Sequence, residues 1–247
     1  MSKTVVEHDG KTYGLGRHPL PRDDRDFLLR NMSPEKLEAI KAPAERTTTR
    51  TFYTMVGKDF RIDQGQEGTC VGHGCTNVLL AGPVVHSEFP SFDNTTDAHI
   101  FARKLYFDAS GDSTYQQGTY TRKALNVLLQ RGQIGAYVRL TSVDEIVDTV
   151  LNHVPVTFGS TWYNNMFRPR SEYNNSYLRV DTSSGVAGGH LYCITGVNLA
   201  PAEGPPYVRM ENSWGPTWGH DGTARIPLDD LHVLYDGDAF MLTENPF

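Results

Sequence analysis

Cysteine is scarce in this sequence. Of 247 residues only three are cysteines: Cys70, Cys75 and Cys193. An odd, low count argues against a scaffold held together by disulfides and fits synthesis in a reducing compartment. No pair has the C-x-x-C spacing of a structural zinc site, so we expect neither a bound metal nor any other cofactor.

Long apolar runs are also lacking. No stretch approaches the roughly 20 apolar residues that a membrane-spanning helix needs. The first residues, MSKTVVEHDGKTYGLG, contain no apolar segment typical of a secretory signal. We therefore expect synthesis in the cytoplasm and no membrane span. A formal net charge of −6 argues against nucleic acid as a partner.

The composition is otherwise that of an ordinary globular protein, with 38% hydrophobic and 21% charged residues. Residues 1–50 are rich in charge and proline. They predict an extended arm or leader that contains one helix, from Ser33 as the N-cap to about Ile40.

Residues 69–150 favour helices, and the residues after Asn152 favour strands. Helical patterns cover 69–80, 96–109, a segment from Thr119 or Thr121 to Gly132, and one after the Ser142–Glu145 capping box. Short β-branched or aromatic segments, typical of an antiparallel sheet, are 154–160, 177–180, 190–197, 207–212 and 222–227. Because helices come first and strands second, the fold class is α+β: an arm (1–50), a helical lobe (51–150) and a β-rich lobe (151–247) with a cleft between the lobes.

Three segments carry residues suited to catalysis. In DQGQEGTCVGHGC (63–75), Cys70 opens a predicted helix, whose N-terminus favours a nucleophilic thiolate. In GVAGGHLYCITGV (185–197), His190 enters a strand after two glycines. In MENSWGPTWGHDGTARI (210–226), Asn212 ends a strand before a turn rich in Trp and Gly. Each segment alone is more often structural than catalytic; their order along the chain carries the argument.

In that order, the three segments resemble papain-like (C1) cysteine peptidases. The chain is most similar to the bacterial and phage branch, whose nucleophile segment reads D-Q-G-x-x-G-[ST]-C. The matching residues are Gln64-Gly65, Gly68-Thr69-Cys70, Gly189-His190, Asn212-Ser213-Trp214-Gly215, Trp218-Gly219 and Gly222. The resemblance covers about residues 55–245 and implies a two-lobed fold with the active site between the lobes.

The resemblance implies a role for each matching residue. Cys70 is the nucleophile that forms an acyl-thioester, His190 is its base in a thiolate–imidazolium pair, and Asn212 orients the imidazole ring. Gln64 and the Cys70 N–H group stabilise the oxyanion, each donor contributing roughly 3 kcal/mol. The residues expected to bind substrate are Trp214, Gly188, Gly189 and Trp162; Trp214 also covers the Asn212–His190 hydrogen bond. The implied activity is hydrolysis of peptide bonds in a peptide or protein.

Two departures from the family pattern leave other functions open. Val71 follows the nucleophile where the family usually has a larger residue, and Glu67 stands where it often has cysteine. Because of Val71 and the long N-terminal arm, one alternative is a papain-fold assembly component, for example in a phage particle, with secondary or lost activity and a final location in the virion or host cytoplasm. Another is a cell-wall amidase. The arm could also cross the cleft and restrain activity.

Overall fold

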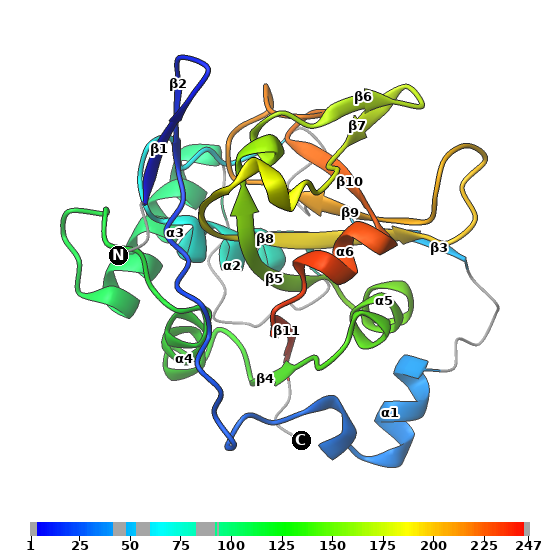
Figure 1. Ribbon diagram of the computed structural model, residues 1–247. Helices are drawn as coiled ribbons and strands as arrows, with labels where there is room; N and C mark the ends of the chain where they lie inside the picture. Colours follow the sequence, from blue (N-terminus) through cyan, green and yellow to red (C-terminus); the bar gives the residue numbers. More distant parts are fainter. Residues whose placement is uncertain (1–3, 42–47, 53–59, 83–91, 93, 245–247) are drawn as a thin grey trace.

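The computed structural model describes residues 4–41, 48–52, 60–82, 92 and 94–244. Six α-helices and a nine-stranded sheet make up most of this part of the chain, together with a separate hairpin (Figure 1). The helices are α1 (Pro34–Lys41), α2 (Cys70–Ala81), α3 (Thr95–Ser110), α4 (Thr121–Gln130), α5 (Val143–Asn152) and α6 (Leu228–Leu234).

The large sheet is almost entirely antiparallel. Its strands are β3 (Thr49–Thr51), β4 (Ala136–Arg139), β5 (Val156–Tyr163), β6 (Arg170–Glu172), β7 (Asn175–Tyr177), β8 (Val186–Asn198), β9 (Tyr207–Glu211), β10 (Thr223–Pro227) and β11 (Asp238–Thr243). They lie in the order β4-β11-β5-β8-β9-β10-β7-β6, with β3 beside β8 and only the β7–β10 pair parallel.

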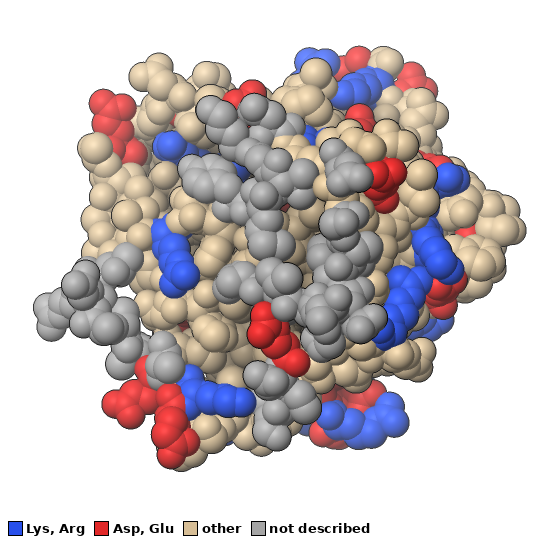
Figure 2. Space-filling view, turned by 180° about the vertical axis from the view of Figure 1, so that it is seen from behind, with Lys and Arg blue, Asp and Glu red and all other residues tan. Residues whose placement is uncertain are grey.

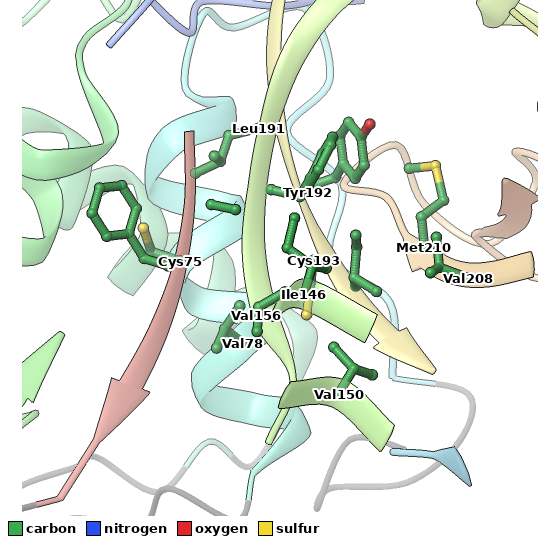
Figure 3. Packing of buried hydrophobic residues seen from close by; sticks show 14 of the residues in the cluster. Cys75, Val78, Ile146, Val150, Val156, Leu191, Tyr192, Cys193, Val208 and Met210 are labelled. Carbon is green, nitrogen blue, oxygen red and sulfur yellow. The ribbon is translucent and has the colours of Figure 1, made fainter. Parts of the chain in front are cut away.

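The core lies where α2 packs against β8. Every residue of α2 is buried, as its unbroken run of small and apolar residues predicts. Gly72 permits a close approach of α3, since a Cβ atom there would lie 2.1 Å from the Ala102 carbonyl oxygen. Figure 3 shows side chains from α2, α5, β5, β8 and β9 meeting in this core. The labelled ones are Cys75, Val78, Ile146, Val150, Val156, Leu191, Tyr192, Cys193, Val208 and Met210.

The described residues of the N-terminal arm, 4–41 and 48–50, pack against the rest of the molecule. They begin with a hairpin of β1 (Val5–His8) and β2 (Lys11–Gly14), whose strands pair only with each other. In Figure 1 the chain then descends past the sheet and the helices to reach α1. Residues 15–18 run beside Gly189 and Thr119, so the arm spans two parts of the chain that are far apart in sequence.

The predicted α+β class is confirmed, and most predicted elements are present within a few residues. The strand predicted at 177–180 is wrong, because only Tyr177 belongs to β7 while Val180 donates its N–H to the Asp230 side chain. The sequence did not predict the hairpin, β4, β6, β11 or α6. The boundaries expected near residues 50 and 150 stay predictions.

Charges of both signs lie next to one another on the face that Figure 2 shows. None of the helices in the described part of the chain has the length and apolarity needed to cross a bilayer.

A turn centred on Asp112 positions the loop that meets the arm. Its buried carboxylate accepts hydrogen bonds from the Gln116 and Gln117 N–H groups (2.8 and 2.9 Å), from Thr114 and from the Tyr106 hydroxyl. The Tyr106 oxygen in turn accepts from the Gly118 N–H. Burial alone would raise the pKa of Asp112, but these hydrogen bonds outweigh it and lower the pKa below its usual value.

We expect Asp112→Asn to lower the free energy of unfolding by about 2 kcal/mol or more, because charge-assisted hydrogen bonds from several donors are weakened together. Chemical denaturation measures the change. Asp24→Asn, whose side chain is 82% exposed, is the matched control and should change stability by less than about 0.5 kcal/mol. Equal effects of the two substitutions would contradict this account of the turn.

Candidate active site

Cys70 is the first residue of α2, directly after the Thr69 N-cap, as predicted. Its side chain is fully buried. Burial raises the pKa of the thiol to about 12, although N–H groups of Leu191 and Arg17 and the Arg17 charge favour the thiolate. The helix N-terminus thus does not keep this sulfur ionised while the site is covered.

His190 is held by Asn212. The ring Nε2 lies 2.8 Å from the Asn212 Oδ1, which also accepts a hydrogen bond from the Ser213 N–H. Because that oxygen can only accept, Nε2 carries the ring hydrogen and Nδ1 holds a free lone pair. Among the described residues, Nδ1 has no hydrogen-bond partner. The arrangement leaves one nitrogen ready to accept a proton.

Cys70 and His190 come from adjacent elements. The Leu191 N–H, one residue after His190, acts on the Cys70 sulfur, and α2 packs along β8. Burial lowers the pKa of His190 to about 4, against the opposing effect of its hydrogen bond to Asn212. At neutral pH both groups are therefore uncharged in this state. The thiolate–imidazolium pair implied by the family resemblance requires a site that water or substrate can enter.

Aromatic rings enclose the imidazole. The Trp214 ring stacks on His190 with 4.7 Å between ring centroids, and Trp162 meets it edge-on at 4.9 Å. Trp162 is fully buried and lies on β5, where it pairs with Gly188 of β8. These positions support the ring; a direct contact of Trp162 or Gly188 with substrate stays a prediction.

The arm lies on the predicted oxyanion donor. Gln64 donates from Nε2 to the Gly14 carbonyl oxygen at 3.2 Å, and the Trp214 Nε1–H donates to the same oxygen at 3.1 Å. The Ser213 hydroxyl donates to the Gln64 Oε1 at 2.5 Å and fixes the orientation of the amide. A peptide carbonyl thus already occupies a position suited to receiving these hydrogen bonds.

Further contacts continue along the arm. The N–H groups of Gly16 and Arg17 donate to the Gly189 carbonyl oxygen at 3.1 and 3.0 Å. Gly16 and His18 exchange backbone hydrogen bonds with Thr119, so Arg17 and Thr119 pair in parallel. Residues 14–18, here called the cleft segment, therefore contact four of the predicted site residues: Gln64, Cys70, Gly189 and Trp214.

The sequence analysis did not predict which residues contact the Arg17 side chain. Its guanidinium contacts Asp236 and Asp238, and nothing in the Asp-Gly-Asp motif distinguishes it from a solvated turn. The only available signal was the Gly-Leu-Gly that precedes Arg17, which suits close packing of a backbone.

His73 does not take part in this arrangement. Its Nδ1 bonds the Thr69 carbonyl oxygen at 3.0 Å and its Nε2 bonds the His99 Nδ1 at 2.9 Å, so both ring nitrogens are occupied. Cys75 and Cys193 are buried free thiols. Within the described ranges, no group of His, Cys, Asp and Glu side chains could hold a metal ion.

The model of the papain family cysteine protease matches residues 94–233, more than half of the chain. The chain belongs to the papain family of cysteine proteases. The matched range contains His190, Asn212 and Trp214 but not Gln64 or Cys70. As a family member the chain is a cysteine peptidase that hydrolyses peptide bonds through a thiol, in peptide or protein substrates.

Solved structures of papain-like proteases share this fold. The chain is similar to xylellain, a cysteine protease from Xylella fastidiosa, with 18% identity and a TM-score of 0.68 over 100% of this chain and 98% of that one. A procathepsin B from Trypanosoma congolense has 14% identity and a TM-score of 0.63, with 94% and 87% covered. Bromelain from Ananas comosus has 12% identity and a TM-score of 0.59, with 79% and 98% covered. The comparison with curated proteins finds no match.

We expect the chain to be most stable between about pH 6.5 and 9. Burial lowers the pKa of His190 to about 4 and that of His73 to about 3, so below pH 6.5 the unfolded chain binds protons first and stability falls. Burial raises the pKa of the Cys70 thiol, so above pH 9 the unfolded chain ionises first and stability falls again.

Denaturant unfolding at several pH values measures this profile. Between pH 6.5 and 5, above the usual range of carboxyl groups, each buried histidine should contribute a slope of up to about 1.4 kcal/mol per pH unit. A free energy of unfolding that stays constant over this interval would show that the two histidines are not buried in their neutral forms.

Proposed function

We propose that Cys70, His190, Asn212 and Gln64 form the active site of this peptidase, and that the cleft segment holds it closed in the resting chain. The observation that carries the proposal is the Gly14 carbonyl oxygen, which accepts hydrogen bonds from Gln64 and Trp214 while Arg17, three residues later, has its N–H at the buried Cys70 thiol. A substrate carbonyl would take the same place once the arm has left.

The residues support a two-step hydrolysis. The Cys70 thiol gives its proton to the His190 Nδ1, and the sulfur attacks the substrate carbonyl carbon while Gln64 donates to the developing oxyanion. The imidazolium of His190 then gives its proton to the leaving amine, and the C–N bond breaks. The acyl group stays on the Cys70 sulfur as the acyl-thioester. In the second step His190 removes a proton from water and the water oxygen attacks the thioester carbon. The C–S bond then breaks, the carboxylic acid product leaves, and the Cys70 sulfur regains its proton from His190.

Asn212 orients the base throughout this sequence. By holding the hydrogen of Nε2 it keeps the Nδ1 lone pair available, and it stabilises the imidazolium that forms. The stacked Trp214 shields this hydrogen bond from water, where it would be weaker. Both contacts exist in the closed state, so the base is organised before the arm moves.

The cleft segment blocks the site because it packs closely against the backbone of Glu67 and Gly68. A Cβ atom on Gly14 would lie 1.9 Å from the Glu67 carbonyl oxygen, and one on Gly16 would lie 2.2 Å from the Gly68 carbonyl oxygen. Tyr13 packs against Phe167 and Trp214, each with 4.8 Å between ring centroids. No substrate backbone can occupy the same space, so the closed chain is inactive in this proposal.

The sequence also suggested a second hypothesis, a structural role in a larger assembly. That the assembly is a phage particle stays a prediction, and so does the final location of the protein. Neither has a structural observation in its favour. The closed site itself accounts for the absence of an exposed thiol, without requiring loss of activity.

We expect Gly14→Ala to expel the cleft segment and to speed labelling by a thiol-directed, peptide-mimicking epoxide at least about tenfold. The physical reason is the overlap of the new methyl group with the Glu67 backbone. Intact-mass spectrometry follows the labelling. Adding Cys70→Ala to Gly14→Ala should abolish it; continued labelling would place the nucleophile elsewhere.

Gly10→Asn is the matched control. Gly10 lies in the turn of the same hairpin, has open space around it and a φ of 73°, a conformation that Asn tolerates. This variant should label as slowly as the unaltered chain. If Gly14→Ala, shown to be folded by circular dichroism, labels no faster than Gly10→Asn, the arm does not restrain the site.

A further inference from the structure

The Arg17 side chain fills an acidic pocket beside the active site. Its guanidinium makes a two-pronged contact with the Asp236 carboxylate, with both nitrogen–oxygen distances 2.7 Å. Its Nε donates to the Asp238 Oδ2, also at 2.7 Å. Arg17 is 1% exposed and Asp238 is fully buried. A fork of donors meeting a planar carboxylate is the contact that distinguishes arginine from lysine.

The pocket is built into the peptidase rather than into the arm. Asp236 and Asp238 flank the start of β11, and the Thr121 hydroxyl of α4 donates to the Asp238 Oδ2 at 2.8 Å. Gly159 of β5 leaves the space, since a Cβ atom there would lie 2.6 Å from the Arg17 Nε. Three separate elements thus shape a cavity that accepts a guanidinium.

The pocket opens next to the reacting groups. The Arg17 backbone N–H donates to the carbonyl oxygen of Gly189, the residue before His190. The charges of Arg17 and Asp238 both act on the Cys70 thiol. A side chain in this pocket therefore belongs to a residue that is bound close to the scissile bond.

An empty pocket would be costly. The Asp238 Oδ1 has no hydrogen-bond partner among the described residues, and burial raises the pKa of this carboxyl against the opposing effect of Arg17. Without Arg17, a buried carboxylate loses its cation and must be protonated or find another.

From these observations we infer that the pocket formed by Asp236 and Asp238 selects substrates with an arginine near the scissile bond, and that Arg17 occupies it as an internal mimic. The inference rests on the proposed function and names the substrate class of the same site. The geometry favours arginine over lysine, and lysine over leucine or glutamate, because only arginine satisfies both carboxylates with its fork of donors.

The kinetic test uses full-length Arg17→Ala, which vacates the pocket and loosens the arm. The substrates are first a series of alanine peptides, each with one arginine at a different position, and the position that gives the highest kcat/KM is identified. Peptides with Arg, Lys, Leu or Glu at that position are then compared by their kcat/KM values. We expect arginine to exceed leucine at least about tenfold. Adding Asp236→Asn should lower the Arg-to-Leu ratio about tenfold or more. Adding Asp229→Asn, an exposed aspartate on α6, should leave the ratio unchanged.

A binding test is independent of hydrolysis. Agmatine, a small guanidinium compound, should raise the melting temperature of Arg17→Ala in a concentration-dependent way, and should do so much less for Arg17→Ala combined with Asp236→Asn. Asp236 is chosen because its side chain is 33% exposed, whereas Asp238 is fully buried and its replacement could disturb folding.

The outcomes separate the two proposals. Peptide hydrolysis with no preference for arginine, or with a preference that Asp236→Asn does not alter, overturns the pocket assignment and leaves the peptidase site standing. Stabilisation by agmatine without hydrolysis of any peptide supports the pocket and overturns the proposed active site. Failure of agmatine to stabilise Arg17→Ala overturns the assignment of the pocket as a guanidinium site.

Discussion

The packing of α2 along β8 is the contact on which the site depends. It brings the Cys70 thiol, on the first residue of α2, to the Leu191 N–H of β8, one residue after His190, in a core that buries both side chains. Burial keeps both groups neutral, as their shifted pKa values indicate. The same packing that assembles the pair therefore leaves it unreactive until something opens the cleft.

Much of this arrangement could be predicted from residue order. The positions of Cys70, His190 and Asn212 are each marked by the residues next to them in sequence. Glycines precede Cys70 and His190, and Asn212 begins the Asn-Ser-Trp-Gly segment. The helices and the long central strands follow from periodicity, which depends on neighbouring residues alone. The Asn212–His190 hydrogen bond and the stacked Trp214 agree with the roles that the resemblance implies.

Other features depend on contacts between distant segments and could not be predicted in this way. The path of the arm is fixed by Gly14 and Gly16 fitting against Glu67 and Gly68, which no local pattern reveals. Arg17 lies more than two hundred residues from Asp236 and Asp238 along the chain. Short strands such as the edge strand β4 and its neighbour β11 pair mainly because the fold brings them together, so their sequences carry little signal.

The hairpin of β1 and β2 forms its own two-stranded sheet and shares no strand pairing with the nine-stranded one. In the proposed opening, the hairpin and the cleft segment lift away together, which breaks the contacts of residues 14–18 and of Tyr13 and leaves every ladder of the main sheet, including the β3–β8 pair, intact. Opening is then a local event whose free energy lies below that of global unfolding. Access to the Cys70 thiol is then set by the equilibrium between the closed and the open positions of the arm. Substitutions in the arm can shift this equilibrium while the catalytic residues stay the same.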